Sequence, residues 1–183
     1  QIARDGNDFD YFDKKYKSAQ SEAEKQYYSL AMFNFTSKIE IEKLQEYLFE
    51  EIPARNRGSA IEVLCANPYA KDTIWEWYLA NLDNFEKLHN FIYQRALTRV
   101  IIASVKYRDE VVDFFDKYMI KNPQVLDPVK KALETLDIKS KFLEFMNADS
   151  KKWSKFWLWY FKDISSRKVD KWKNNIIYGG IEW

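Results

Sequence analysis

The segment from Asn67 to Asn81 constrains the fold more than any other part of the chain. Its sequence is Asn-Pro-Tyr-Ala-Lys-Asp-Thr-Ile-Trp-Glu-Trp-Tyr-Leu-Ala-Asn. Asn67 can accept the free amide hydrogens of a first helical turn, Pro68 suits the first helical position, and Asn81 can open the next helix. The apolar residues between these caps are Tyr69, Ile74, Trp75, Trp77, Tyr78 and Leu79. Because they point in several directions, the predicted helix is covered on more than one side, which is typical of stacked helices.

The composition favours an all-helical protein. The chain has 183 residues, of which 46% are hydrophobic and 31% charged, as in a folded globular protein. Only four Gly and four Pro are present, too few for the many tight turns of a sandwich or barrel. No stretch shows sustained period-two alternation, so we expect no sheet. The net charge of +1 predicts no general attraction to nucleic acid or to an anionic membrane.

Caps and apolar stripes recur along the chain at the spacing of short helices. Side-chain caps are predicted at Asn7 or Asp8, at Ser21 with Glu24, at Ser37 with Glu40, and for a last helix at Asp149 or Ser150. Breaks are predicted at Pro53, Asn122-Pro123 and Asp127-Pro128. The predicted buried faces are Phe9, Phe12, Tyr16 and Ala19; Ala23, Tyr27, Leu30 and Ala31; Ile41, Leu44, Leu48 and Ile52; Ile61, Leu64 and Cys65; Phe85, Leu88 and Ile92; Leu97, Val100, Ile101 and Val105; Val111, Phe115 and Tyr118; Val129, Ala132, Leu133 and Leu136; and Phe142, Phe145 and Met146.

Helices of roughly 10 to 15 residues with connections of about 2 to 6 residues form antiparallel pairs. We therefore predict an all-α fold in which such pairs stack into a curved HEAT-like or ARM-like superhelical array. Residues 1–183 would form a single helical-repeat domain. A compact helical bundle is the alternative.

A series of short motifs lies between about residues 8 and 146. The motifs are Tyr16, Glu24-Lys25, Leu30-Ala31, Ala66-Asn67-Pro68, Ile74-Trp75-Glu76-Trp77-Tyr78, Asn81, Arg99-Val100-Ile101, Glu110-Val111-Val112-Asp113-Phe114-Phe115 and Ala132-Leu133-Glu134. In order and spacing this part of the chain resembles the C-terminal helical domain of M1-family zinc aminopeptidases, of the tricorn-interacting-factor and endoplasmic-reticulum aminopeptidase type. The resemblance implies a domain of stacked helices that caps the catalytic domain and encloses a chamber for peptides. The parent enzyme would remove amino-terminal residues from those peptides.

The resemblance also implies that the chemistry lies upstream of this chain. The family holds zinc with a His-Glu-x-x-His helix and a further Glu, and it grips the substrate's amino terminus with a Gly-x-Met-Glu-Asn loop. Neither motif is present in this sequence. Zinc catalysis needs about three protein ligands and a Glu that activates water, and the single His89 cannot supply them. We therefore expect no catalytic residue and no metal site here, zinc in the upstream domain, and that domain and the parent's peptides as partners.

Arg99 is the candidate for a residue that faces the peptide chamber. It lies among Leu97, Val100 and Ile101, where a charged side chain must reach solvent, form an ion pair or face a wet cavity. Two interpretations stay open: a structural ion pair, and a guanidinium that attracts a substrate carboxylate. Structural rather than binding roles are assigned to Asn67, Pro68, Trp75, Trp77 and Asn81.

Three other motifs receive structural interpretations. Glu86 and His89 have the Glu-x-x-His spacing of metal-binding bundles, but one copy is too few, so we interpret His89 as a helix-surface residue. Cys65 follows Leu64 on an apolar face and is predicted to be a buried small hydrophobe rather than a nucleophile. Asn34-Phe35-Thr36 matches a glycosylation acceptor, yet a turn between helices is the preferred interpretation.

Residues 148–183 depart from the family pattern. Aromatic residues gather there, namely Trp153, Phe156, Trp157, Trp159, Tyr160 and Phe161, with Trp172 and Trp183 beyond them. From Lys151 onward there are eight basic residues against three acidic ones. Such a segment can bind single-stranded nucleic acid or a membrane interface. We favour a last helix packed on the array or on a neighbouring domain, and we expect no nucleic-acid partner.

The compartment and the class of function follow from weaker signals. The single cysteine excludes an internal disulfide and favours a reducing compartment, so we predict a cytoplasmic protein. No signal-peptide leader opens the chain, and no apolar run approaches the ~20 residues that span a bilayer. Because the chain begins at Gln1 without an initiator Met, we expect further sequence upstream. The alternative function is a free-standing helical-repeat adaptor that binds a peptide or protein partner.

Overall fold

The computed structural model describes residues 8–148 and 152, and all regular structure in these residues is helical. The prediction of an all-α fold is therefore confirmed for this part of the chain. Contacts between residues group the described chain up to Ser140 into one compact unit. Residues 141–148 belong to a second unit.

The helices are short and follow one another closely. In chain order they are α2 (Phe9–Ser18), α3 (Glu22–Met32), α4 (Lys38–Glu50), α5 (Ala54–Ala66), α6 (Ile74–Ala80), α7 (Leu82–Glu86), α8 (Asn90–Ala103) and α9 (Arg108–Lys121). Two 3-10 turns, η1 (Val105–Tyr107) and η2 (Pro123–Val125), flank α9. A further helix covers residues 126–148.

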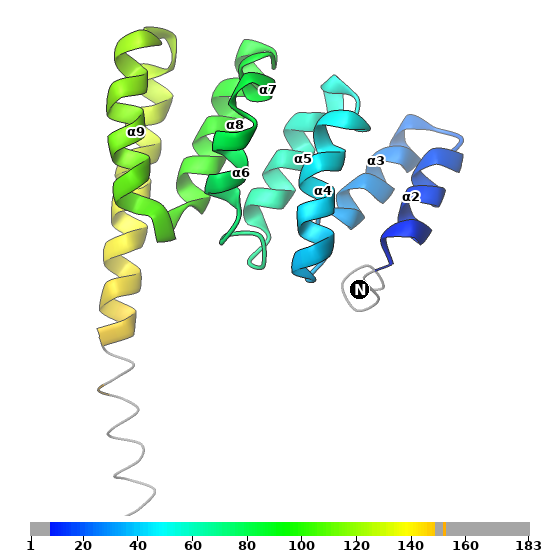
Figure 1. Ribbon diagram of the computed structural model, residues 1–183, viewed down its shortest axis with the longest axis horizontal. Helices are drawn as coiled ribbons and strands as arrows, with labels where there is room; N and C mark the ends of the chain where they lie inside the picture. The colour runs from blue at the N-terminus through cyan, green and yellow to red at the C-terminus, as the bar shows by residue number, and fades with distance from the viewer. Residues whose placement is uncertain (1–7, 149–151, 153–183) are drawn as a thin grey trace, which may run out of the picture. The chain divides into compact units, whose positions relative to one another are not determined.

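Successive helices pack as pairs within the first unit. Helix α2 packs against α3, α4 against α5, and α6 against α8, with the short α7 joining the last two. Helices α3, α5 and α8 lie side by side, because α5 contacts both of the others (Figure 1). Each pair therefore buries apolar surface against the next pair.

The predicted caps form in part. The Asp8 carboxylate caps α2 by accepting an amide hydrogen bond of 3.0 Å, and the Ser21 hydroxyl accepts the amide of Glu24 at 3.1 Å. The Glu24 carboxylate accepts a hydrogen bond of 3.0 Å from the backbone N–H of Gln20. In a standard capping box this donor would be the backbone N–H of Ser21. Ser37 precedes α4 but makes no side-chain cap, so the second predicted capping box is wrong.

The buried face of α3 also differs from the prediction. Tyr27 is 76% exposed and Ala23 is exposed, although both belong to the predicted stripe. Leu30 and Ala31 of the same stripe are half-buried, and the fully buried residues lie at the end of α3 and just beyond it, namely Met32, Phe33 and Phe35. Burying these three large side chains removes more apolar surface from water than burying Ala23 and Tyr27 would.

The helix predicted from Asn67 begins seven residues later, at Ile74, and turns occupy residues 68–73. Asn67 is buried, and its side-chain amide donates to the carbonyls of Phe33 and Phe35 at 3.2 and 2.7 Å. Its side-chain oxygen accepts the amide of Tyr69 at 3.0 Å, which closes a local turn. Asn67 therefore joins the α3–α4 connection to the α5–α6 connection instead of capping a continuous helix.

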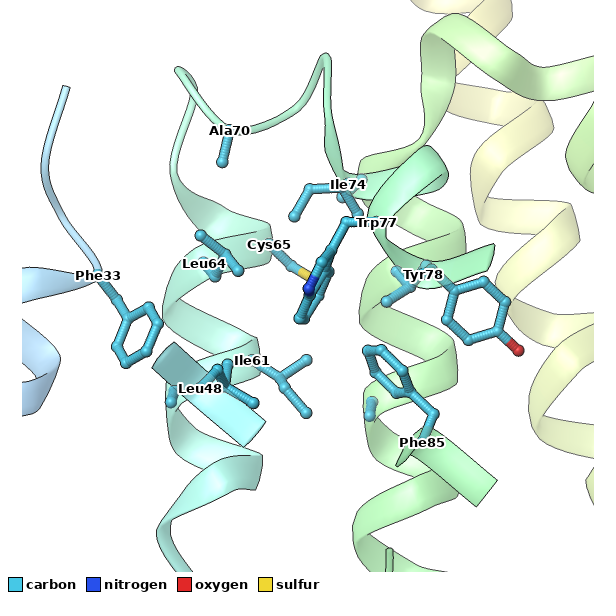
Figure 2. Packing of buried hydrophobic residues seen from close by; sticks show 14 of the residues in the cluster. Phe33, Leu48, Ile61, Leu64, Cys65, Ala70, Ile74, Trp77, Tyr78 and Phe85 are labelled. Atoms are coloured by element: carbon cyan, nitrogen blue, oxygen red, sulfur yellow. The ribbon is translucent and has the colours of Figure 1, made fainter. Parts of the chain in front are cut away.

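Helix α6 is nevertheless covered on more than one side. Toward α4, the indole N–H of Trp77 donates to the carbonyl of Gln45 at 3.1 Å, and the Gln45 amide donates to the Thr73 hydroxyl at 2.8 Å. The Trp77 ring also contacts Phe49 and Phe85, with centroid distances of 5.9 and 5.1 Å. Figure 2 shows Trp77 within the buried cluster that includes side chains of α4, α5 and α7.

Toward α9, the same short helix presents Trp75 and Tyr78. The Trp75 ring lies edge-on to Phe114 at 5.5 Å, and the Tyr78 ring stacks on Phe115 at 6.0 Å. Both α6 residues are buried. Asn81 lies between α6 and α7, and its amide donates to the Trp77 carbonyl at 3.1 Å.

The helix that covers residues 126–148 agrees with the sequence prediction only near its start. The helix begins at residue 126, next to Asp127-Pro128, and Val129, Ala132 and Leu136 are buried. The predicted buried face does not continue, because Phe142, Phe145 and Met146 are 60%, 61% and 48% exposed. The helix predicted from Asp149 or Ser150 and the aromatic cluster from Trp153 onward lie outside the described residues.

Replacing Asn67 by Ala should destabilise the chain much more than replacing Asn81 by Ala. Asn67→Ala removes two donors from backbone carbonyls in a buried site, and we expect a loss of about 3 kcal/mol in the free energy of unfolding. The Asn81 side chain donates to the Trp77 carbonyl and accepts from the Asn84 amide at 3.2 Å, and both partners lie within four residues of it, so Asn81→Ala should cost about 1 kcal/mol. Urea unfolding of both variants measures the difference, and equal losses would refute the role of Asn67 as a link.

Candidate functional site

Arg99 lies on α8 and forms an ion pair with Glu62 on α5. The distance from its Nε atom to the Glu62 Oε1 atom is 3.2 Å. Arg95, one turn earlier on α8, binds the same carboxylate through two hydrogen bonds of 2.7 and 2.9 Å. The Arg99 side chain remains 52% exposed. One carboxylate therefore serves two guanidinium groups, and the cluster keeps an excess of positive charge.

A cavity of about 380 Å³ opens beside Arg99. Its lining includes the charged residues Glu62, Arg99 and Lys139, together with apolar side chains of α5 and α8. Burial lowers the pKa of the Lys139 ammonium, and the positive charges of Lys71 and Arg99 lower it further. Cations thus gather around the cavity, which favours an anionic group as its ligand. Both interpretations of Arg99 are compatible with this geometry, because the residue is paired and also lines a cavity.

Cys65 is buried beside the same cavity. Burial raises the pKa of its thiol to about 12. A thiol that stays protonated at neutral pH is neither a nucleophile nor a ready metal ligand. The prediction of a buried small hydrophobe is confirmed.

The Glu-x-x-His motif does not lie on one helix. Glu86 is the last residue of α7, whereas the exposed His89 precedes α8 as its N-cap. The expectation of a helix-surface histidine is therefore wrong in detail, because the chain turns between the two helices. Within residues 8–148, no group of three His, Cys, Asp or Glu residues has the arrangement needed to hold a metal ion. The Asn34-Phe35-Thr36 motif lies in the α3–α4 connection, as predicted.

Sequence reasoning missed a tyrosine network that joins α7, α8 and α9. The Tyr118 hydroxyl donates to the Glu86 carboxylate at 2.6 Å, and the hydroxyls of Tyr93 and Tyr118 share a hydrogen bond. Burial raises the pKa of both phenols, so they remain protonated donors at neutral pH. A polar cavity of about 300 Å³ lies beside them, with Asn90 and Asn122 in its lining. The sequence had indicated Glu86 only as part of a metal-binding spacing and Tyr118 only as part of a buried face, so the hydrogen bond between them was not predicted.

Comparisons with known proteins give no further assignment: no protein-family model, curated protein or solved structure matches the chain. In the part of the chain that the structure describes, no helix combines the length and apolar character needed to cross a membrane.

The Cys65 thiol should react with Ellman's reagent at about pH 8 at least ~100-fold more slowly in the native chain than in the unfolded chain, because reaction requires an opening of the structure. The folded pKa of about 12 lies above the ordinary value of 9.0. As the pH rises through that interval, the unfolded chain releases the thiol proton first. The contribution of the buried, protonated Cys65 thiol to the free energy of unfolding is therefore fully present below pH 9.0. It is lost progressively as the pH rises toward about 12.

Cys65→Ala is the control for this titration. The variant should lose less stability than the native sequence over the same pH interval in urea unfolding. Reaction of the native thiol at the unfolded rate would contradict its burial.

Proposed function

We propose that this chain is the C-terminal, non-catalytic domain of an M1-family zinc aminopeptidase, and that it forms part of the wall of the parent's peptide chamber. The observation that carries the proposal is that several motifs of the resemblance fall on helices of one compact unit. Ile74-Trp75-Glu76-Trp77-Tyr78 forms most of α6, Arg99-Val100-Ile101 lies on α8, and the motif that starts at Glu110 lies on α9. The aromatic residues of α6 and α9 contact each other directly.

The arrangement of helix pairs supports the finer architecture that the resemblance implies. Neighbouring pairs bury apolar surface against each other through α3, α5 and α8 (Figure 1). A HEAT-like array uses packing of this kind, in which each pair contacts only its neighbours. We propose that the pairs form a curved superhelix of the HEAT-like or ARM-like type.

In this role the chain contributes shape and charge rather than chemistry. Its helices exclude folded proteins, confine peptides near the upstream zinc site, and move with the opening and closing of the chamber. The described residues do not fit zinc, because no suitable group of ligands exists among them. The half-exposed guanidinium of Arg99 is the group that we propose attracts a peptide carboxylate.

The isolated chain should show no turnover of amino-acid amide reporter substrates in the presence of added zinc. The physical reason is that the described residues contain no group of three zinc ligands, and the sequence contains no His-Glu-x-x-His motif. A fluorescence assay across a zinc titration checks this expectation. Turnover that persisted after repurification and eluted with this chain would contradict the proposal.

A second candidate is a free-standing helical-repeat adaptor that binds a peptide or protein partner, and a groove between α6 and α9, lined by Trp75, Leu79 and Phe114 among others, favours it. The coding sequence upstream of Gln1 distinguishes the two functions. A reading frame that encodes His-Glu-x-x-His several hundred residues earlier supports the aminopeptidase domain. A start codon immediately before Gln1 supports the adaptor.

In the parent enzyme, Arg99→Ala should lower kcat/KM for peptides by about fivefold, the value of one exposed charge-assisted hydrogen bond. Amino-acid amide reporters, which have no carboxylate to bind, should be cleaved at an unchanged rate. Arg95→Ala is the matched control, because Arg95 also pairs with Glu62 but does not line the cavity. Equal effects of the two substitutions on peptide cleavage would assign Arg99 a structural role only.

A further inference from the structure

A groove of about 450 Å³ lies between α6 and α9, on residues separate from the Arg99 cavity. Four of its lining residues are apolar or aromatic: Trp75 and Leu79 of α6, and Phe114 and Tyr118 of α9. On each helix the two residues are four positions apart, so they lie on one face of that helix. Trp75 is buried at 1% exposure, so the exposed apolar surface on the α6 side comes from Leu79. Leu79 is 41% exposed, so its side chain is accessible to a ligand.

The other lining residues are charged and ordered along α9. Glu110 and Asp113 lie in its first half, and Lys117 and Lys121 lie in its second half. Within the described residues, none of these four side chains takes part in a recorded ion pair. The helix dipole accounts for Glu110 in the first turn and Lys121 in the last turn. Asp113 and Lys117 are four positions apart in the order that favours a helix, but no ion pair joins them. The order of charges is therefore available to a partner.

We propose that this groove binds an amphipathic helix of a partner protein, oriented antiparallel to α9, with acidic residues in its first turn and basic residues in its last turn. In this orientation the acidic turn of the partner meets Lys117 and Lys121, and its basic turn meets Glu110 and Asp113. The same charge order also favours the partner's own helix, because acids stabilise a helix N-terminus and bases a C-terminus. The dipoles of the two antiparallel helices attract each other as well.

The dimensions of the groove fit a helix of about three turns. Eleven residues separate Glu110 from Lys121, which corresponds to about 16 Å at the rise of an α-helix. A helix can place its side chains at positions i, i+3 or i+4, and i+7 into a groove that is lined by apolar residues of two neighbouring helices. The groove between α6 and α9 has such a lining. The inference goes beyond the aminopeptidase proposal and does not depend on it, because the surface belongs to the described chain itself.

A designed peptide tests the proposal on the full 183-residue chain. The probe is a fluorescein-labelled, end-capped peptide of about 16 residues with three leucines at i, i+4 and i+7, glutamates in its first turn and lysines in its last turn. The second probe has the same composition with the glutamate and lysine blocks exchanged. Fluorescence anisotropy should show saturable binding of the first peptide and at least about fivefold weaker binding of the second at ~0.1 M salt. The difference should shrink at ~1 M salt because the charges are then screened.

Exchanging the charges also weakens the second peptide's own helix, so weaker binding of that peptide alone does not prove a contact with the groove. A variant of the protein with exchanged groove charges separates the two effects. The variant that combines Glu110→Lys, Asp113→Lys, Lys117→Glu and Lys121→Glu leaves the peptides unchanged and reverses the groove. Its preference for the two peptides should shift toward the exchanged one by at least about tenfold relative to the native chain, because all four contacts change sign.

Leu79→Lys tests the apolar contact, and Ile120→Lys is its matched control. Both replace an exposed aliphatic residue near the end of a helix, but the 82% exposed Ile120 does not line the groove. We expect at least about tenfold weaker peptide binding for Leu79→Lys and less than about twofold change for Ile120→Lys. Unchanged urea unfolding of both variants shows that they fold.

Several results would overturn the proposal. They are absence of saturable binding, an unaltered preference in the charge-inverted variant, and equal affinities of Leu79→Lys and the native chain. Analytical ultracentrifugation of the native chain, which measures its oligomeric state, gives another result that would overturn the proposal. A dimer that Leu79→Lys abolishes would assign the groove to a second copy of this chain instead of a partner helix.

Discussion

Helix α6 holds the neighbouring helices together through ring contacts on two sides. A helix of seven residues has almost no stability of its own, because the free-energy cost of helix nucleation exceeds the stabilisation from so few backbone hydrogen bonds. Tertiary burial therefore determines that it forms. Trp77 packs on Phe49 and Phe85 toward α4 and α7, and Trp75 and Tyr78 pack on the aromatic residues of α9. The position of α9, and with it one wall of the groove, depends on these contacts.

The parts of the fold that sequence periodicity predicted are those in which local and tertiary preferences agree. On α4, Ile41, Leu44 and Leu48 form one stripe, and all three are fully buried. The face of α3 and the start of α6 could not be predicted in this way, because distant contacts decide them. Asn67 shows the reason. Its side chain satisfies carbonyls more than thirty residues away in sequence, and no local pattern contains that information.

The candidate site was predictable only in its central residue. Arg99 stands out in the sequence because a charge interrupts an apolar segment, but its neighbours come from other helices. Glu62 lies 37 residues earlier on α5, and Lys139 belongs to the helix that starts at residue 126. The groove on α9 is a different case. Its charges recur at helical spacing in the sequence, yet their significance depends on Trp75 and Leu79 from α6, which only the folded chain brings beside them.

Sharing of Glu62 determines what the Arg99 cavity can bind. If each guanidinium had its own carboxylate, both pairs would be neutral and Lys139 alone would attract an anion to the cavity. Arg95 holds Glu62 with two short hydrogen bonds, and Arg99 reaches the same carboxylate with a single longer contact. The weaker pair is the one at the cavity, so an incoming carboxylate competes there with an exposed contact that contributes little to stability. Lys139 adds a further positive charge on the same lining, and the site therefore favours anions even while the ion pair is intact.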